Sequence, residues 1–252
     1  MRLPDFTQCF DKSHLATMRK GYAPVSFDRA ELLAERYLLA TEGRYHVYYA
    51  PVGSWPREET RVLFLGITPG FAQVVAAADA YLHTAPAIRN NEDAFSDVLR
   101  NKVAYIGPMR DNLCRMLDDI DFPKAYGVKN SDELFAAKRT EITASSTLIF
   151  PVFQGPEMKN FSGVRNLSRS ALFRTMLDKL LAPRVKRAPN ALVIPLGVVA
   201  GDGVRYLCEN YDLPSDRVLW HLPHPSPANG RRESEFKKYK KTMRAFIEAF
   251  FR

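Results

Sequence analysis

The sequence has few cysteines, and their spacings are not those of a disulfide framework or a metal site. Cys9, Cys114 and Cys208 are the three cysteines among 252 residues, and no two of them form a C-x-x-C pair. A disulfide framework or a structural zinc site normally uses such pairs, and an iron–sulfur cluster normally uses four thiolates. We therefore expect three thiols without a ligand role, no metal and no cofactor.

Long apolar runs, repeats and low-complexity segments are also missing. No run approaches the roughly 20 apolar residues of a membrane-spanning helix, and the first residues, MRLPDFTQCFDKSH, lack the apolar stretch of a secretory signal. Hydrophobic residues make up 46% and charged residues 25%, which is ordinary for a chain with a packed core. The expectation is one domain spanning 1–252, cytoplasmic, monomeric and without a membrane partner.

Acidic residues are too few to balance the basic ones. The chain has 36 Lys and Arg against 28 Asp and Glu, a net charge of +8. Eight Lys or Arg and three Glu lie between positions 231 and 252, so this segment carries five of the eight net charges. Residues 233–252 are predicted to form a basic amphipathic helix. A polyanionic partner is favoured, but the charge alone does not separate DNA, RNA and acidic membranes.

Four short apolar runs alternate with helical patterns and read as buried strands. They are 61–65 (RVLFL), 147–153 (TLIFPVF), 191–196 (ALVIPL) and 217–222 (RVLWHL). Such alternation predicts an α/β fold with three layers, αβα, around a central four-stranded, mainly parallel sheet. Residues 1–58 are predicted to be a largely helical or irregular extension. It would include a helix over 28–40 that begins at Asp28 and a short strand over 46–49.

The first and last of these strands end in loops of unusual composition. GITPG follows the first, where Gly66 and Gly70 would allow positive φ and Pro69 would stiffen the turn. HPSPAN follows the last, with His224 placed to donate a hydrogen bond to a developing oxyanion. Carboxyl ends of parallel strands share one edge, so both loops would face one crevice. A plain turn at GITPG and a structural histidine are the alternatives. His221 and His224 make a poor metal pair, because residues three apart on an extended chain point to opposite faces.

Four segments in this order resemble the uracil-DNA glycosylase superfamily. GITPG and HPSPAN are similar to its two signature loops, G-x-x-P-G (or G-Q-D-P-Y) and H-P-S-P. Between them, AYIGPMRDNLCRML (104–117) and VIPLGVVAGDGVRYL (193–207) are similar to two further segments of that superfamily. The resemblance spans about residues 60–230 and favours a branch without an iron–sulfur cluster.

The resemblance implies a monofunctional DNA glycosylase of base excision repair, which hydrolyses the N-glycosidic bond of a flipped-out uracil or another deaminated or damaged base. Its partners would be lesion-containing DNA and the abasic product, so it would lie at the nucleoid in a bacterium. His224 would stabilise the departing base as an anion. Tyr105 would stack on that base, with Phe71 as the second candidate. Further base contacts would come from the GITPG loop: Gly66, Ile67, Pro69 and Gly70.

Two positions depart from the superfamily pattern. Thr68 and Ile67 stand where members of the superfamily often carry an acidic or amide group that orients or activates the attacking water. Thr68 can position a water but cannot act as a base near neutral pH. A carboxylate from the segment 72–100 could take that role, and the candidates there are Asp79, Glu92 and Asp93. Gln154 is the amide nearest to the position where relatives read the pyrimidine edge.

The segment after HPSP would contact DNA through Ser226, Pro227, Ala228, Asn229, Arg231 and Arg232. Ala228 is too small to fill the gap left by the base, whereas Arg231 could stack there or contact a phosphate. Two other functions stay open: a protein that binds uracil or abasic sites with little or no catalysis, and a nucleotide hydrolase. No Walker loop, G-x-S-x-G elbow or metal triad supports the hydrolase.

Overall fold

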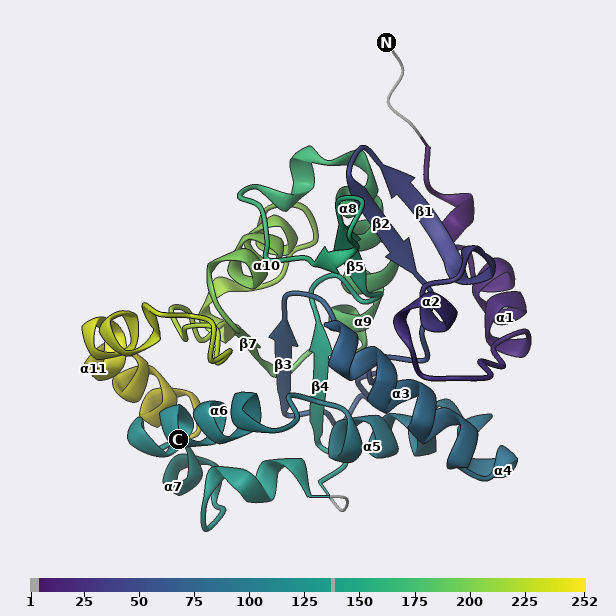
Figure 1. Ribbon diagram of the computed structural model, residues 1–252. Helices are drawn as coiled ribbons and strands as arrows, with labels where there is room; N and C mark the ends of the chain where they lie inside the picture. The colour runs from purple at the N-terminus through teal and green to yellow at the C-terminus, as the bar shows by residue number, and fades with distance from the viewer. Residues whose placement is uncertain (1–4, 137–138) are drawn as a thin grey trace.

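A three-stranded parallel sheet lies at the centre of the molecule (Figure 1). The computed structural model describes residues 5–136 and 139–252. In sheet order the strands are β4 (Ile142–Ser146), β3 (Val62–Gly66) and β7 (Leu192–Pro195). All three run in the same direction, so their carboxyl ends lie at one edge. The chain is therefore a mixed α/β protein, as expected, although the central parallel sheet has three named strands.

Helices cover both faces of this sheet because side chains alternate along each strand. Val62 and Phe64 of β3 belong to one apolar core, and Leu63 and Leu65 belong to the other. The first core includes residues of α6 (Pro108–Asp119), α7 (Phe122–Tyr126) and α11 (Arg232–Phe250). The second includes residues of α3 (Phe71–His83), α8 (Ala171–Met176) and α10 (Val198–Asn210).

Two of the four expected core strands differ from the sequence prediction. The second is β4 at 142–146 rather than 147–153, because buried Thr143, Ser145 and Ser146 interrupt the apolar pattern there. The expected strand at 217–222 contacts the sheet through one parallel bridge between Val193 and Val218. His221, with φ of 73°, then departs from an extended path.

A second, antiparallel sheet joins the N-terminal extension to the middle of the chain. Its order is β1 (Leu38–Glu42), β2 (Tyr45–Tyr48), β5 (Val152–Gln154) and β6 (Lys159–Asn160). The expected short strand at 46–49 thus corresponds to β2. The expected helix over 28–40 is wrong beyond its first turn, because α2 covers only Arg29–Leu32 and β1 follows soon after. Its cap is as predicted: the Asp28 carboxylate accepts a hydrogen bond from Glu31 N at 2.9 Å.

The remaining helices lie outside the two sheets. They are α1 (Lys12–Lys20), α4 (Pro86–Arg89), α5 (Glu92–Lys102) and α9 (Ala182–Arg187), with a π-helical turn at Leu177–Leu181 between α8 and α9. Short 3-10 turns occur at Gln8–Phe10, Glu35–Tyr37, Ser131–Phe135, Leu167–Arg169 and Ser215–Arg217. None of the helices within the two described stretches combines the length and the apolar character needed to cross a bilayer.

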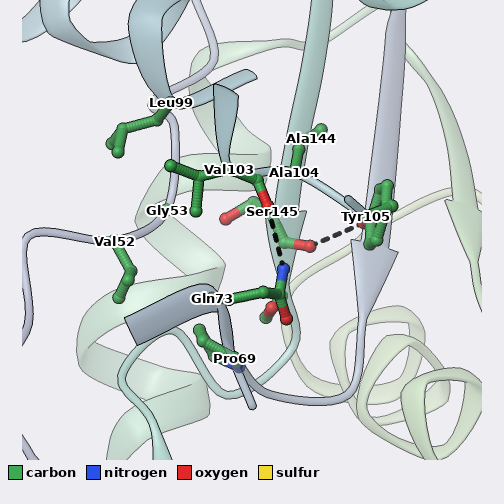
Figure 2. A pocket seen from close by; sticks show the side chains of 11 residues that line it. Val52, Gly53, Pro69, Gln73, Leu99, Val103, Ala104, Tyr105, Ala144 and Ser145 are labelled. Carbon is green, nitrogen blue, oxygen red and sulfur yellow. Dashed lines mark hydrogen bonds between the residues drawn. The ribbon is translucent and has the colours of Figure 1, made fainter. Parts of the chain in front are cut away.

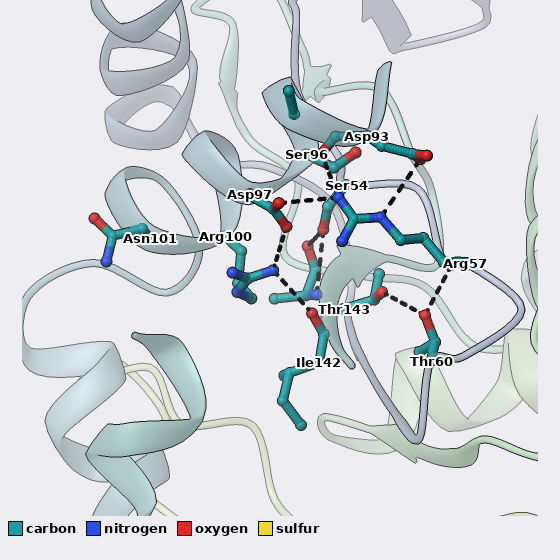
Figure 3. A network of polar contacts seen from close by, with 12 residues as sticks. Ser54, Arg57, Thr60, Asp93, Ser96, Asp97, Arg100, Asn101, Ile142 and Thr143 are labelled. Atoms are coloured by element: carbon teal, nitrogen blue, oxygen red, sulfur yellow. Dashed lines mark hydrogen bonds and ion pairs between the residues drawn. The ribbon is translucent and has the colours of Figure 1, made fainter. Parts of the chain in front are cut away.

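A polar network fixes the segment between the two sheets (Figure 3). Arg57 pairs with Asp97 of α5 at 2.9 Å, and Asp97 also pairs with buried Arg100 at 2.7 Å. The hydroxyl of buried Ser54 donates to Ala144 O of β4 at 2.6 Å. Because partners satisfy these buried polar groups, the connection is held to the core. The N-terminal extension is therefore an integral part of the fold.

Candidate functional site

The GITPG and HPSPAN loops meet at one cleft beside the carboxyl ends of the parallel strands. The cleft has a volume of about 610 Å³, within the range of small-molecule sites. Its lining includes most of the predicted residues: Gly66, Ile67, Thr68, Gly70, Phe71, Tyr105, His224, Ser226, Ala228 and Asn229. The prediction that strand topology brings these loops to one crevice is thus met by the geometry.

His224 is held in one tautomer at this cleft. Its Nδ1 accepts a hydrogen bond from the backbone N–H of Ser226 at 3.2 Å. Burial lowers the pKa of the imidazole to about 4, so the ring is neutral near pH 7. Since Nδ1 is the acceptor, the ring hydrogen lies on Nε2. The side chain therefore offers the cleft a neutral N–H donor.

The lowered pKa of His224 makes the fold sensitive to acid. The unfolded chain has the ordinary pKa near 6.5, and the folded chain about 4, so between these values the unfolded state binds more protons. The free energy of unfolding should therefore fall as the pH drops through this window, by about 2–3 kcal/mol at pH 4.5. Urea unfolding of the wild type and His224→Gln at pH 7 and pH 4.5 measures this. The variant should lose less stability than the wild type, and equal losses would reject the assignment.

Hydrogen bonds from its neighbours brace the HPSPAN loop. Asn229 Nδ2 donates to His224 O at 3.1 Å, Asn112 Nδ2 donates to Pro225 O at 2.9 Å, and Arg232 Nη1 donates to Ser226 O at 3.0 Å. The side chains of Asn229 and Arg232, predicted as DNA contacts, are thus engaged in holding the loop. Ser226 Oγ accepts from Ala228 N at 3.2 Å, which leaves its own O–H to be donated.

The other predicted contacts after HPSP are exposed. Pro227, Ala228 and Arg231 are accessible to solvent, and Ala228 also lines the cleft. Arg231 immediately precedes α11, and its backbone N–H donates to Asn229 Oδ1 at 3.1 Å. These residues are therefore free to meet a ligand that approaches the cleft from outside.

Thr68 joins the GITPG loop to the neighbouring chain. Its hydroxyl donates to Phe150 O at 2.9 Å and accepts from Val152 N at 3.1 Å. The hydroxyl hydrogen is thus committed, and one lone pair remains to accept a hydrogen bond from a water. Ile67 beside it has an apolar side chain. The loop therefore contains no group that could take a proton from water near neutral pH.

The two glycines of GITPG do not have left-handed backbone, and only Gly66 permits an unusually close approach. Neither Gly66 nor Gly70 has positive φ, which corrects the sequence expectation. A Cβ on Gly66 would lie 3.3 Å from Tyr105 Cε1, and one on Gly70 would lie 3.6 Å from Asn160 Nδ2. The space above Gly66 thus allows the Tyr105 ring to lie against the end of β3.

Tyr105 lies at the back of the cleft and is 4% exposed. Its hydroxyl donates to Ser145 O at 2.8 Å, and burial raises the pKa of the phenol (Figure 2). Behind it is a cavity of about 20 Å³, lined among others by Pro69 and Gln73, so Pro69 faces this cavity rather than the cleft. Only a small part of the ring is thus accessible to a ligand.

Phe71, the second stacking candidate, is more accessible than Tyr105. It begins α3, lines the cleft and is half-buried. The guanidinium of Arg29, from the N-terminal extension, lies 4.1 Å from the ring centroid. An Arg so placed over an aromatic face is attracted by the ring. One face of Phe71 is thus occupied by the extension.

Gln154, predicted to read the pyrimidine edge, lies outside the cleft lining, as Pro69 does. It ends β5, and its Oε1 accepts from Arg44 at 3.3 Å, away from the cleft lining. Asn160 of β6 lines the cleft instead, with its Oδ1 accepting from Phe71 N at 3.0 Å. That bond fixes the amide and leaves its N–H groups to be donated. The sequence carries no local signal for this residue, since its position depends on a two-residue strand.

The carboxylates considered for water activation lie elsewhere. Asp79 pairs with exposed His83 at 3.0 Å, Glu92 with Arg187 at 3.6 Å and Asp93 with Arg57 at 3.6 Å. None of the three lines the cleft, whereas Glu235 of α11 does. Sequence reasoning also missed other residues of the lining, among them the apolar Ile106, Met109, Val198 and Val199. In the sequence, such apolar residues are indistinguishable from ordinary core residues.

The basic face of α11 is partly used within the protein. Lys240 pairs with Asp119 at 3.3 Å, and Arg244 pairs with Asp121 at 2.9 Å, which docks the helix on the loop between α6 and α7. Lys237, Lys238 and Lys241 are exposed. His221 stacks on Tyr239 of this helix with ring centroids 4.0 Å apart. Within the described residues, no three His, Cys, Asp or Glu side chains gather in a way that could hold a metal ion.

Comparison with known proteins identifies a relative without a stated activity. No protein-family model matches the chain. It is 29% identical over 233 residues to the uncharacterized protein YoxB of Bacillus subtilis, an alignment that covers 91% of this chain and 89% of that protein. The similarity thus extends over most of both chains.

Proposed function

We propose that this protein is a monofunctional DNA glycosylase of the uracil-DNA glycosylase superfamily. It hydrolyses the N-glycosidic bond of uracil, or of another deaminated or damaged base, flipped out of DNA. The observation that carries the proposal is the neutral imidazole of His224, whose Nε2–H is offered to a cleft that the GITPG loop also lines. A donor so placed stabilises the negative charge that develops on a departing base.

The geometry of the cleft supports a flipped base as the ligand. Phe71 and Tyr105 supply aromatic surface, and the amide of Asn160 supplies hydrogen-bond donors to a base edge. The hydroxyl of Ser226 at the rim is available to a phosphate oxygen. Among the described residues, no lysine lines the cleft to form a Schiff base, so the proposed reaction ends at the abasic site.

The alternative function is a protein that binds uracil or abasic sites without cutting. One observation favours it: the hydroxyl hydrogen of Thr68 is committed to Phe150 O, and Ile67 is apolar, so the GITPG loop lacks a water activator. The two functions share the same cleft and the same ligand. They differ in whether the base is released.

Incubation with uracil-containing oligonucleotides, single-stranded and duplex, separates these functions. Heating in alkali breaks the strand at any abasic site, so breaks at the uracil position identify a glycosylase. Binding without breaks identifies the non-cutting alternative, and neither binding nor breaks rejects both. Hypoxanthine, xanthine and ethenocytosine in the same position then define the base range, and oligonucleotides without a lesion are the control.

A further inference from the structure

Glu235 is the acidic side chain of the cleft. It lies one turn into α11, is half-buried and is the one Asp or Glu among the residues that line the cleft. Within the described residues, no Lys, Arg or His forms an ion pair with it, although Arg231 and Arg232 are nearby in sequence. A half-buried carboxylate without a cation partner contributes little to stability. Its place in the cleft therefore calls for another explanation.

Hydrogen bonds fix Glu235 relative to His224. The HPSPAN loop and the start of α11 are joined by Arg232 Nη1 donating to Ser226 O and by Arg231 N donating to Asn229 Oδ1. Glu235 N in turn donates to Arg231 O at 3.0 Å. The backbone of Glu235 and the HPSPAN loop thus belong to one braced unit, and both Glu235 and His224 line the same cleft.

The other polar groups of the cleft cannot accept a proton from water. His224 Nδ1 already accepts from Ser226 N, and its Nε2 carries the ring hydrogen. Hydroxyls come from Thr68, Ser146, Ser162 and Ser226, amides come from Gln73, Asn160 and Asn229, and none of these groups is a base near neutral pH. A carboxylate is the remaining side chain of the lining that can do so.

We propose that Glu235 is the general base that activates the attacking water, an inference that rests on the proposed glycosylase function. The carboxylate takes a proton from the water as its oxygen forms a bond to C1′ of the sugar. The bond between C1′ and the base nitrogen breaks, and its electron pair leaves with the base. His224 Nε2–H stabilises the resulting negative charge on the base, which later takes up a proton from solvent.

The test is the single-turnover rate of uracil release by Glu235→Gln with the enzyme in excess. We expect the rate to fall by about 10²-fold, the lower end of what a positioned base contributes. DNA affinity should stay equal or increase, because the change removes a negative charge that repels phosphates. If Glu235 had no catalytic role, the same change would leave the rate of uracil release equal to that of the wild type or higher. A fall in this rate therefore distinguishes the two interpretations.

Glu233→Gln is the matched control, since this exposed residue of the same helix pairs with Arg115 at 2.6 Å and is not part of the cleft lining. Its rate should equal that of the wild type. A Glu235→Gln rate at or above the wild-type rate overturns the assignment, as does a changed base preference with an unchanged rate on uracil. If the wild type itself releases no base from any lesion, the proposed function fails instead.

Discussion

Replacing His224 by asparagine is expected to lower the single-turnover rate of uracil release by about 10²–10³-fold, the usual cost of losing an oxyanion donor. The imidazole donates through Nε2 because Nδ1 accepts from Ser226 N, and asparagine is too short to place its amide at the same point. The change corresponds to about 2.7–4 kcal/mol of transition-state stabilisation. Affinity for uracil-containing DNA should change little, because the donor acts on charge that appears only as the bond breaks.

His221→Asn is the matched control for this variant. His221 precedes the same loop, stacks on Tyr239 and does not line the cleft. Its φ of 73° lies in the left-handed region, which asparagine tolerates better than most residues. Its rate should match the wild type. An unchanged rate in His224→Asn, or an equal loss in both variants, would remove the imidazole from the mechanism.

Gly197→Ala is expected to lower the single-turnover rate of uracil release by about 10²-fold, because the added methyl group would collide with His224 and displace its imidazole. Gly197 has φ of 86°, and a Cβ there would lie 2.8 Å from His224 Cβ and 3.2 Å from His224 N. Both the backbone conformation and the contact resist a side chain, so either α10 or the HPSPAN loop must shift. A displacement near 1 Å is enough to cost a reaction about 10²-fold. The strain should also lower the free energy of unfolding by about 1–3 kcal/mol.

Gly230→Ala tests whether the Gly197 effect is specific. Gly230 lies in the same region, its φ is not positive, and a Cβ there would meet nothing within 4 Å. That variant should keep the wild-type rate and the wild-type melting temperature. Single-turnover release and thermal unfolding of both variants are the measurements. Full activity of Gly197→Ala would mean that the loop adapts without moving the imidazole.

The sequence indicated the strands whose residues are continuously apolar. β3 and β7 have no polar residue inside them, so burial on both faces was readable. β4 was missed because Thr143 and Ser145 are buried in it, and the contact that helps Thr143 tolerate burial, its hydroxyl 3.3 Å from that of Thr60, comes from a distant part of the chain. The helix predicted over 28–40 failed for a related reason, since pairing of β1 with β2 overrides the local helical preference.

The sequence predicted those residues of the candidate site that lie within short continuous segments. Thr68 and His224 lie in short loops of unusual composition at strand ends, and the parallel sheet brings those loops together. Asn160 and Glu235 could not be found in this way, because a hairpin and a helix bring them to the cleft from outside the signature loops. The small size of Ala228 was visible in the sequence, but the exposure of Arg231 and the bracing role of Arg232 were not.

The antiparallel sheet, which the N-terminal extension and the middle of the chain build together, limits how this protein can be truncated. Half of that sheet comes from the first fifty residues, and its other half carries Asn160, whose amide holds the start of α3. Arg29 from the same extension covers one face of Phe71. A fragment trimmed to the parallel sheet and its helices would therefore lose one wall of the cleft along with the extension. Substitutions that disrupt the hairpin of β1 and β2, which lies outside both the GITPG and the HPSPAN loop, should accordingly impair function as substitutions in the cleft itself do.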